Sequence, residues 1–282
     1  MATVTFFHAH PDDEAIATGG TMASLADQGH RVVLVTATGG ELGEVPDGLL
    51  GPDESLAERR AVEVADAARI LGAQRQVFLG YEDSGMEGEE SASRPGCFAT
   101  TDVDEAARRL AGLLAEEGSD VLVTYDEHGG YGHPDHVQVH RVGMAAADLA
   151  GTPVVYMATM DRDFMIGLRA QATESGLLPA EEMEGAETMG EPGTRITTQV
   201  GVGPWVDTKR RAMRAHASQI PEDSFFLAMP DDVFATVWGQ EWYVRARPEP
   251  VGLGDGVRES GLVLDATGHV LGGGSDGEGV AR

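Results

Sequence analysis

The chain has 282 residues, of which 41% are hydrophobic, so it is long enough for one large core or for a core with a small appendage. Its formal net charge of −27 repels phosphate backbones and anionic lipid, which argues against nucleic acid and membranes as partners. No apolar stretch approaches the roughly 18 residues that span a bilayer. The N-terminus lacks the basic region of a signal peptide, so we expect a cytoplasmic protein. The single cysteine, Cys97, excludes an intrachain disulfide and an all-thiolate metal site.

Strands and helices are predicted to alternate through the first half of the chain. The apolar segments expected as strands are Thr3–His8, Arg31–Thr38, 76–79, 120–125 and 153–158. The segments expected as helices are 14–29, 55–71, 102–117 and 136–149. Ser55 and Glu58 have the spacing of a capping box at the start of the second helix. These βα units with short connections predict an α/β fold, namely a Rossmann-like, doubly wound, mostly parallel sheet with helices on both faces.

The second half is expected to add a small C-terminal α+β appendage. A β-like segment over 195–200 and a helix over 204–219 precede an aromatic-bearing stretch over 233–245. Residues 171–194 are rich in Glu, Gly, Ala and Met, which indicates a mobile insertion that is either a lid or a plain excursion. We expect a catalytic core over 1–160, a C-terminal portion of the same domain over 161–248, and a Gly- and acid-rich tail with little order over 249–282.

Two polar strings of similar chemistry follow predicted strands that are far apart in the sequence. The first reads HAHPDDE over residues 8–14, and the second reads GHPDH over residues 132–136. Because the carboxyl ends of parallel strands meet at one edge of a sheet, the two strings are expected to lie together there. The polar loops over 39–44 and 80–86 are expected at the same edge. Imidazoles and carboxylates without thiols suit a mononuclear Zn²⁺ with a spare carboxylate base beside it.

The spacing within the first string suggests a division of roles. His10 and Asp13 are three residues apart, close enough in a turn to share one ion, which leaves Asp12 free as a general base. In the second string, one of His133 and His136 can complete a set of two histidines and one aspartate. The other imidazole is then an acid or an oxyanion donor, oriented by Asp135.

For either string alone, a capped helix start with satisfied loop histidines is an equally good interpretation. The joint occurrence of both strings after parallel strands favours the interpretation as a metal site with a carboxylate base.

The other histidines carry weaker signals. His8 is expected either as a packing group or as a group that supports the ligands from behind, and His140 as a helix-face neighbour of the site. His216 shares a predicted helix with Arg211 and Arg214; we expect a surface helix, and a role in the site stays open. No Gly-x-Gly-x-x-Gly follows the first strand and no Gly-x-Ser-x-Gly is present, which argues against a dinucleotide-binding protein and a serine hydrolase.

At this point the two strings resemble the motifs of a known family. AHPDDE over 9–14 and HPDH over 133–136 are similar to the two motifs of the LmbE-like, or PIG-L, family of zinc-dependent de-N-acetylases. The resemblance covers residues 3–160 and extends weakly to 245. The strings DSGM over 83–86, TYD over 124–126, GGYG over 129–132 and RAMRAHASQ over 211–219 resemble the actinobacterial, mycothiol-pathway-like branch, which contains a deacetylase and a conjugate amidase.

The resemblance implies a metal centre and a base. His10, Asp13 and His136 would be the ligands of one Zn²⁺ per chain, with Fe²⁺ or another divalent ion as the alternative. Asp12 would be the general base.

The resemblance also implies how the substrate is held. His133 would stabilise the tetrahedral oxyanion or protonate the amine, with Asp135 tuning it. Tyr131 would lie on a mobile loop and bind the carbonyl oxygen. Arg60 and Asp83 fall where this branch places residues that contact sugar or inositol.

The implied reaction is hydrolysis of the acetamide of an N-acetylglucosamine-type small glycoside, which releases acetate and a free amine. The implied partner is therefore a small N-acylated amino sugar, and a homo-oligomer stays open. Alternatives in the same class are an amidase of thiol conjugates and a deacetylase of an antibiotic sugar. A sugar-binding protein without catalysis would show a broken motif, and none is broken here. A redox or nucleotide-binding α/β domain would require the absent glycine fingerprint.

Overall fold

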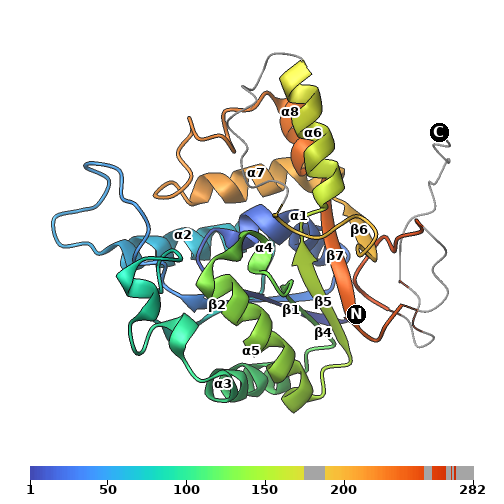
Figure 1. Ribbon diagram of the computed structural model, residues 1–282, viewed down its shortest axis with the longest axis horizontal. Coiled ribbons are helices and arrows are strands. Elements are labelled where there is room, and N and C mark those ends of the chain that lie inside the picture. The colour runs from blue at the N-terminus through green and yellow to red at the C-terminus, as the bar shows by residue number, and fades with distance from the viewer. Residues whose placement is uncertain (175–187, 251–255, 265–267, 269, 271–282) are drawn as a thin grey trace.

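A computed structural model describes residues 1–174, 188–250, 256–264, 268 and 270 (Figure 1). Seven strands form one sheet in the order β3-β2-β1-β4-β5-β7-β6. Strands β1 to β5 pair in parallel, whereas β7 is antiparallel to both of its neighbours. The predicted mostly parallel α/β fold is therefore confirmed. The strands are β1 Thr3–His8, β2 Arg31–Thr38, β3 Arg75–Tyr81, β4 Val121–Tyr125, β5 Val154–Thr159, β6 Thr198–Gly201 and β7 Gln240–Arg247.

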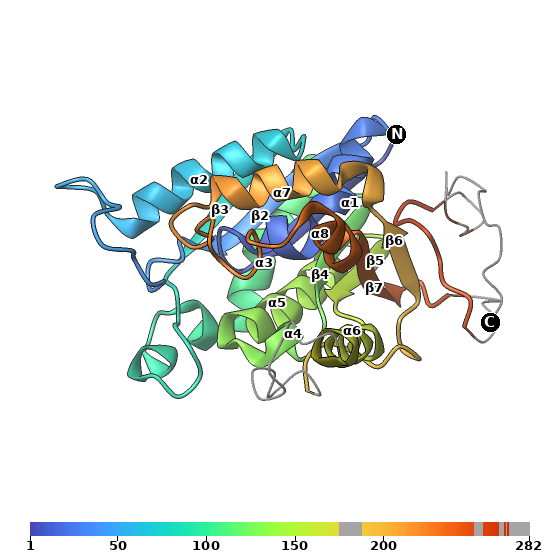
Figure 2. The ribbon, with the colours of Figure 1, turned by 90° about the horizontal axis from the view of Figure 1, so that it is seen from above.

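Helices cover both faces of this sheet (Figures 1 and 2). On one face α1 (Gly19–Asp27) and α2 (Leu56–Ile70) pack against α7 (Val206–Ala215), and on the other α3 (Val103–Glu117) packs against α5 (Pro134–Ala150). None of the described helices has the length and apolarity that a bilayer crossing needs. The remaining helical segments are α4 Gly129–Gly132, α6 Arg162–Glu174, α8 Asp231–Trp238, the π-helical Glu14–Thr18 and the 3-10 turns Glu90–Ser93, Phe98–Thr100 and Gly203–Trp205.

The position of the site follows from the strand order. β1 is hydrogen-bonded to β2 on one side and to β4 on the other, so the chain leaves the sheet in opposite directions at this point. A crevice forms beyond the carboxyl ends of the strands at such a reversal. Phe6, Leu34 and Leu122, from these three strands, are fully buried, as a sheet covered on both faces requires. The first polar string begins at the carboxyl end of β1, and the second follows β4 after the loop and short helical turn over 126–131.

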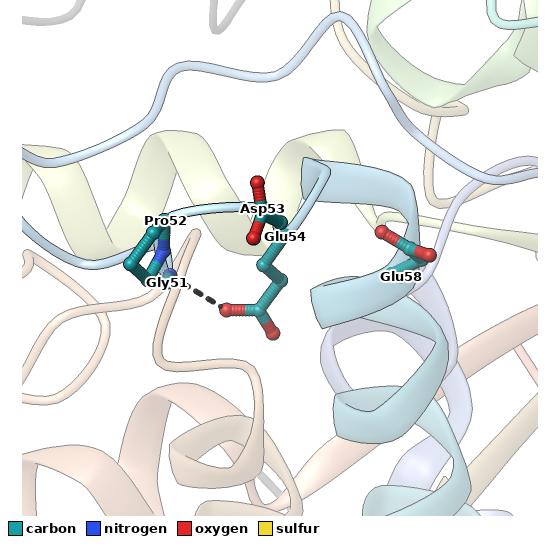
Figure 3. Close-up of a pocket in the computed structure, with 5 residues that line it drawn as sticks. All are labelled: Gly51, Pro52, Asp53, Glu54 and Glu58. Carbon is teal, nitrogen blue, oxygen red and sulfur yellow. Dashed lines mark hydrogen bonds between the residues drawn. The ribbon is translucent and has the colours of Figure 1, made fainter.

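The capping box at the start of α2 is confirmed. The Ser55 hydroxyl accepts a hydrogen bond from the Glu58 amide at 3.3 Å, and the Glu58 carboxylate accepts one from the Ser55 amide at 2.9 Å. A surface hollow lies beside this cap (Figure 3). It contains carboxylates but none of the imidazoles of the two strings, so it is separate from the predicted chemistry. Its lining residues are Gly51, Pro52, Asp53, Glu54 and Glu58.

The helix predicted over 14–29 is interrupted. A π-helical segment ends at Thr18, and α1 begins at Gly19. The reason lies on β7, where the Glu241 carboxylate accepts the amides of Gly20 and Thr21, both at 2.8 Å, and so satisfies the first turn of α1. The same carboxylate is paired with Lys209 Nζ at 2.6 Å, and this lysine is only 1% exposed. The sequence pattern gave no sign of this long-range cap.

The described part of the predicted tail is packed. Leu262 and Val263 are buried in the core. The Glu259 amide donates to the Thr197 carbonyl at 2.8 Å, and Arg258 pairs with Asp161 at 2.7 Å. The expectation of little order is therefore wrong for residues 256–264. Residues 251–255, 265–267, 269 and 271–282 lie outside the described residues.

The predicted insertion over 171–194 is described only in part. Its first residues continue α6 to Glu174, and 175–187 lie outside the described residues, so the interpretation as a lid stays a prediction. At its other end the Gly190 amide donates to the Gly130 carbonyl at 2.9 Å, which ties this segment to α4.

Candidate metal centre

The two polar strings meet at the end of the sheet. His10 follows β1, and His133 and His136 lie at the start of α5, after β4. One ring nitrogen from each of these three buried histidines lies within 4.8 Å of the others. The rings of His10 and His133 have centroids 4.6 Å apart and cross edge to face. Three buried imidazoles this close together form a group that can hold a metal ion.

Asp13 lies between two of these imidazoles. One of its carboxylate oxygens is 3.5 Å from His10 Nδ1 and accepts the His10 amide at 2.8 Å. The other is 3.4 Å from His136 Nε2. Burial would raise the pKa of Asp13, but the neighbouring His136 and His10 rings hold it well below its usual range. Asp13 is therefore a permanent carboxylate within reach of two ring nitrogens.

His136 has the hydrogen-bonding pattern of a metal ligand. Its Nδ1 lies 3.2 Å from the Gly129 carbonyl, which places the proton on Nδ1 and leaves a lone pair on Nε2. That Nε2 is buried and has no hydrogen-bond partner among the described residues. A cation would satisfy this atom, and a carbonyl behind the ring is a common way to orient a histidine ligand. The residues present thus fit a divalent metal.

Gly129 makes this orientation possible. Its φ of +64° belongs to the left-handed region that glycine adopts without strain. A Cβ atom on Gly129 would lie 2.5 Å from the Cβ of His136 and 2.7 Å from the Val137 amide nitrogen. The close approach of this loop to α5 is what brings the carbonyl to the His136 ring.

Asp12 combines a strained backbone with a half-buried carboxyl group. Its φ is +113°, and it is the one non-glycine residue with positive φ in the described part of the chain, a conformation that costs on the order of 1–3 kcal/mol. Arg60 Nη2 lies 3.2 Å from its Oδ2. Burial, opposed by the charge of Arg60, raises the pKa of Asp12 to about 6. A carboxyl group that titrates near neutrality is suited to general-base work.

His133 is a neutral hydrogen-bond donor in this arrangement. Its Nδ1 accepts the Asp135 amide at 3.1 Å, so its ring proton is on Nε2. Burial, together with the neighbouring His10 and His136 rings, lowers the pKa of His133 to about 4. An imidazole with Nε2–H can donate to an oxyanion.

Asp135 is placed differently from the role that the resemblance implies. Its fully buried carboxylate accepts the Ser84 amide at 3.0 Å and lies 3.2 Å from His10 Nε2. The Asp135 carboxylate therefore orients His10, and only its backbone amide reaches His133.

Tyr131 lies at the mouth of the cluster. It belongs to α4, a short helical turn interrupted at Gly130, where φ is +72°. Its side chain is 50% exposed, and its ring centroid is 4.8 Å from that of His136 and 6.2 Å from that of His133. The phenol thus borders both the imidazoles and solvent.

The two predicted substrate contacts, Arg60 and Asp83, are buried in the walls of the site. Arg60 donates to the carbonyls of Gly40, at 2.7 Å, and Pro11. The Asp83 carboxylate accepts the Gly85 amide at 2.9 Å and lies 3.5 Å from His10 Nε2. Each is 4% exposed. The structure therefore gives both residues a wall-building role, and contact with substrate stays a prediction.

Sequence reasoning missed the partner of His216. This residue is fully buried, and its Nε2 lies 2.6 Å from Glu14 Oε1 in the first string, so the expected surface position is wrong. The signal available was Glu14 itself, because a carboxylate at the start of a buried helix needs a partner. His8, predicted as a packing group, is buried and bonded to the hydroxyls of Tyr125, at 2.7 Å, and Thr18, at 2.9 Å.

The fold and the cluster define a Rossmann-like α/β protein with a candidate mononuclear metal site at the reversal of its strand order. The profile of the PIG-L family, described as GlcNAc-PI de-N-acetylase, matches residues 5–147. The chain belongs to this family, which confirms the resemblance seen in its motifs.

Full-length relatives agree with this assignment. The chain is 42% identical over 281 residues to the 1D-myo-inositol 2-acetamido-2-deoxy-alpha-D-glucopyranoside deacetylase of Streptomyces griseus, with 90% of this chain and 86% of that protein covered. It is 41% identical over 277 residues to the protein of the same name from Acidothermus cellulolyticus, with 93% and 94% covered. The solved N,N'-diacetylchitobiose deacetylase of Pyrococcus horikoshii superposes with a TM-score of 0.55 at 21% identity, over 89% of this chain and 87% of that one. At this identity the superposition shows a shared fold.

Proposed function

We propose that the chain is a zinc-dependent de-N-acetylase that hydrolyses the acetamide of an N-acetylglucosaminyl-inositol or a closely similar small glycoside. The observation that carries the proposal is Asp12, a half-buried carboxyl group with a pKa of about 6 beside Arg60, next in sequence to Asp13, which lies between two imidazoles of a buried cluster. The two relatives named as deacetylases of such a glycoside support the substrate class.

We assign the metal ligands as His10, Asp13 and His136. The unpartnered Nε2 of His136 and the carboxylate of Asp13 beside both histidines support this set. Nitrogen and oxygen donors of this kind suit Zn²⁺, and Fe²⁺ accepts the same ligands. Zn²⁺ bound there supplies a Lewis acid for a carbonyl and lowers the pKa of a water molecule.

The side chains around the ligands carry out the proton transfers. Asp12 takes a proton from the water that attacks the acetamide carbonyl carbon. Tyr131 and His133 donate hydrogen bonds to the carbonyl oxygen as it gains negative charge. The C–N bond then breaks as the leaving nitrogen takes the proton that Asp12 received from the water. His133, a neutral imidazole with a pKa of about 4, is the alternative and weaker proton donor. The products are acetate and the free amine.

The substrate is a small N-acylated amino sugar. We assign Arg60 and Asp83 to the wall on which the sugar or inositol hydroxyls bind, because Arg60 borders Asp12 and Asp83 borders His10. These contacts would add to the hydrogen bonds that both residues already make within the protein. The fold alone does not determine which glycoside binds, because the loops beyond the carboxyl ends of the strands shape the substrate pocket.

One assay tests the proposal directly. Metal-loaded protein is mixed with 1D-myo-inositol 2-acetamido-2-deoxy-α-D-glucopyranoside, with N-acetylglucosamine and with diacetylchitobiose, and released primary amine and acetate are quantified. We expect equal amounts of both products, fastest from the inositol glycoside. The isosteric variant Asp12→Asn, which lacks the base but keeps the volume, serves as the matched control.

The assay also separates the alternatives. Amine release from a thiol conjugate with a larger acyl group, and none from the acetamides, would make the chain an amidase. Absence of amine from every substrate, with folded protein and a full metal complement, would overturn the proposed hydrolysis.

A further inference from the structure

We propose that Glu14 and His216 form a positioning pair that holds the Asp12 backbone in the conformation its carboxyl group needs. The inference rests on the proposed function, because it concerns the residue assigned there as the general base. Neither member of the pair is assigned contact with the substrate; both act through Asp12.

A continuous set of hydrogen bonds links the pair to Asp12. His216 Nε2 lies 2.6 Å from Glu14 Oε1, and the other oxygen, Oε2, accepts the Asp12 amide at 3.0 Å. Glu14 and His216 are both fully buried. Each carboxylate oxygen of Glu14 therefore has one partner, the imidazole on one side and the Asp12 backbone on the other.

Asp12 is the residue of this loop that needs such support. With φ at +113° its peptide is held away from the regions that side-chain-bearing residues prefer, so it relaxes unless its surroundings fix it. Its carbonyl accepts the amides of Ala15 and Ile16 at 3.0 and 3.1 Å, which fixes one end of the residue. The hydrogen bond from the Asp12 amide to Glu14 fixes the other end of the residue.

His216 in turn fixes Glu14. Its Nδ1 has no hydrogen-bond partner among the described residues, so Glu14 is the group that orients the ring. A buried imidazole paired with a carboxylate contributes little to stability compared with an apolar pair of the same shape. The need to hold the Asp12 backbone therefore explains the polar pair better than a contribution to stability does.

The residues that follow His216 provide a matched control. The Ser218 hydroxyl donates to Glu63 at 2.6 Å, and the side-chain Nε2 of Gln219 donates to the Glu44 carbonyl at 3.0 Å. Ser218 is as deeply buried as His216 and lies on the same segment, but in the described part of the chain its partner Glu63 makes no hydrogen bond with Asp12. Ser218→Ala therefore removes a comparable buried hydrogen bond without touching the proposed pair.

The kinetic test is a double-mutant cycle with the metal-loaded enzyme. We expect His216→Ala to lower kcat by about 10- to 100-fold, with KM and bound metal close to those of the wild type. In the Asp12→Ala background the same substitution should have no further effect, because the residue through which it acts is gone. Ser218→Ala should leave kcat unchanged, and His216→Gln, which keeps a donor to Glu14, should recover part of the loss.

A second measurement does not depend on activity. Deuterium uptake by a peptide that covers residues 9–16 reports the hydrogen bond of the Asp12 amide. We expect faster uptake in His216→Ala and unchanged uptake in Ser218→Ala. If His216→Ala does not fold, Glu14→Gln takes its place in both measurements.

The outcomes distinguish the two proposals. If the wild type releases no amine from any glycoside, the proposed function fails, while the exchange comparison still decides whether the pair holds the Asp12 backbone. If His216→Ala lowers kcat by the same factor with and without Asp12, or raises only KM, or leaves the uptake unchanged, the positioning pair is overturned even though the enzyme is a deacetylase.

Discussion

Arg60 Nη2 lies 3.2 Å from Asp12 Oδ2, and the same guanidinium donates to the carbonyl of Pro11, one residue earlier. A third donation, to Gly40, joins the loop after β2 to this contact. One buried cation on α2 thus connects two loops of the rim and the carboxyl group of the proposed base. The fixed, planar geometry of the guanidinium makes these simultaneous contacts possible, and a lysine ammonium cannot reproduce them.

Arg60→Lys should therefore act on turnover more than on binding. We expect kcat to fall by about 10- to 100-fold because Asp12 loses its alignment. The neighbouring Arg59→Lys, which alters the partly exposed pair with Glu54 and a long hydrogen bond to the Leu49 carbonyl but no contact with Asp12, should behave like the wild type. Steady-state kinetics check this. A rise in KM at constant kcat would instead support the role of Arg60 as a substrate contact alone.

Asp12 and Asp13 are adjacent but should respond differently to truncation. Asp12→Ala is expected to keep its metal and to lose on the order of 10²-fold or more in kcat, because only the base is removed. Asp13→Ala is expected to lose the metal, because it removes a proposed ligand. Elemental analysis of the dialysed proteins, alongside kinetics, tests both. Metal loss in Asp12→Ala with retention in Asp13→Ala would exchange the two roles.

The three imidazoles should separate into ligands and a donor. His136→Ala is expected to abolish metal binding, whereas His133→Ala should retain the ion and lose turnover by about 10²-fold, the effect of removing one oxyanion donor. Metal titration by calorimetry measures the first, and single-turnover kinetics the second. A full metal complement in His136→Ala would refute the ligand set, and loss of metal in His133→Ala would add His133 to it.

Gly129→Ala tests the close approach behind His136. The Cβ would be 2.5 Å from that of His136, so the ring must move and metal affinity should fall. Gly118→Ala, at the end of α3, is the matched control, since Gly118 has a similar φ of +59° and open space around it. Both variants should lose about 1–2 kcal/mol of unfolding free energy from the left-handed backbone. If both also bind metal with wild-type affinity, the Gly129 contact does not orient His136.

Lys209 and Glu241 form a buried ion pair whose disruption should be costly. Lys209→Met leaves the Glu241 carboxylate buried without its cation, and we expect a loss of about 3–5 kcal/mol in the free energy of unfolding. The exposed pair of Arg69 and Asp66 is the control, and Arg69→Met should change stability by less than about 1 kcal/mol. Urea denaturation measures both. A small effect at Lys209 would mean that the amides of α1 alone satisfy Glu241.

Local patterns in the sequence were enough to predict most of the sheet. The bounds of β2 were predicted to the residue, because an unbroken apolar run flanked by polar residues leaves little choice. The start of α2 at Leu56 followed from its capping box. The meeting of the two strings followed from the rule that ligands bind beyond the carboxyl ends of parallel strands.

Features that depend on distant partners were not predictable in this way. The break before α1 depends on Glu241, more than two hundred residues away, and the burial of His216 depends on Glu14. The orientation of the Asp135 carboxylate toward His10 is set by Ser84, on a third loop. Each of these three features depends on a side-chain contact between segments that are far apart in the sequence. The hydrophobic periodicity of one segment contains no information about such contacts.

The burial of Lys209 provides a way to measure local opening of the protein. It is the only lysine in the sequence, and it is 1% exposed against Glu241. Reagents that acylate amines should therefore modify the folded protein at the terminal amino group and leave Lys209 untouched until α7 separates from β7. The rate at which Lys209 becomes labelled would then report, at a single position, how often this part of the molecule opens.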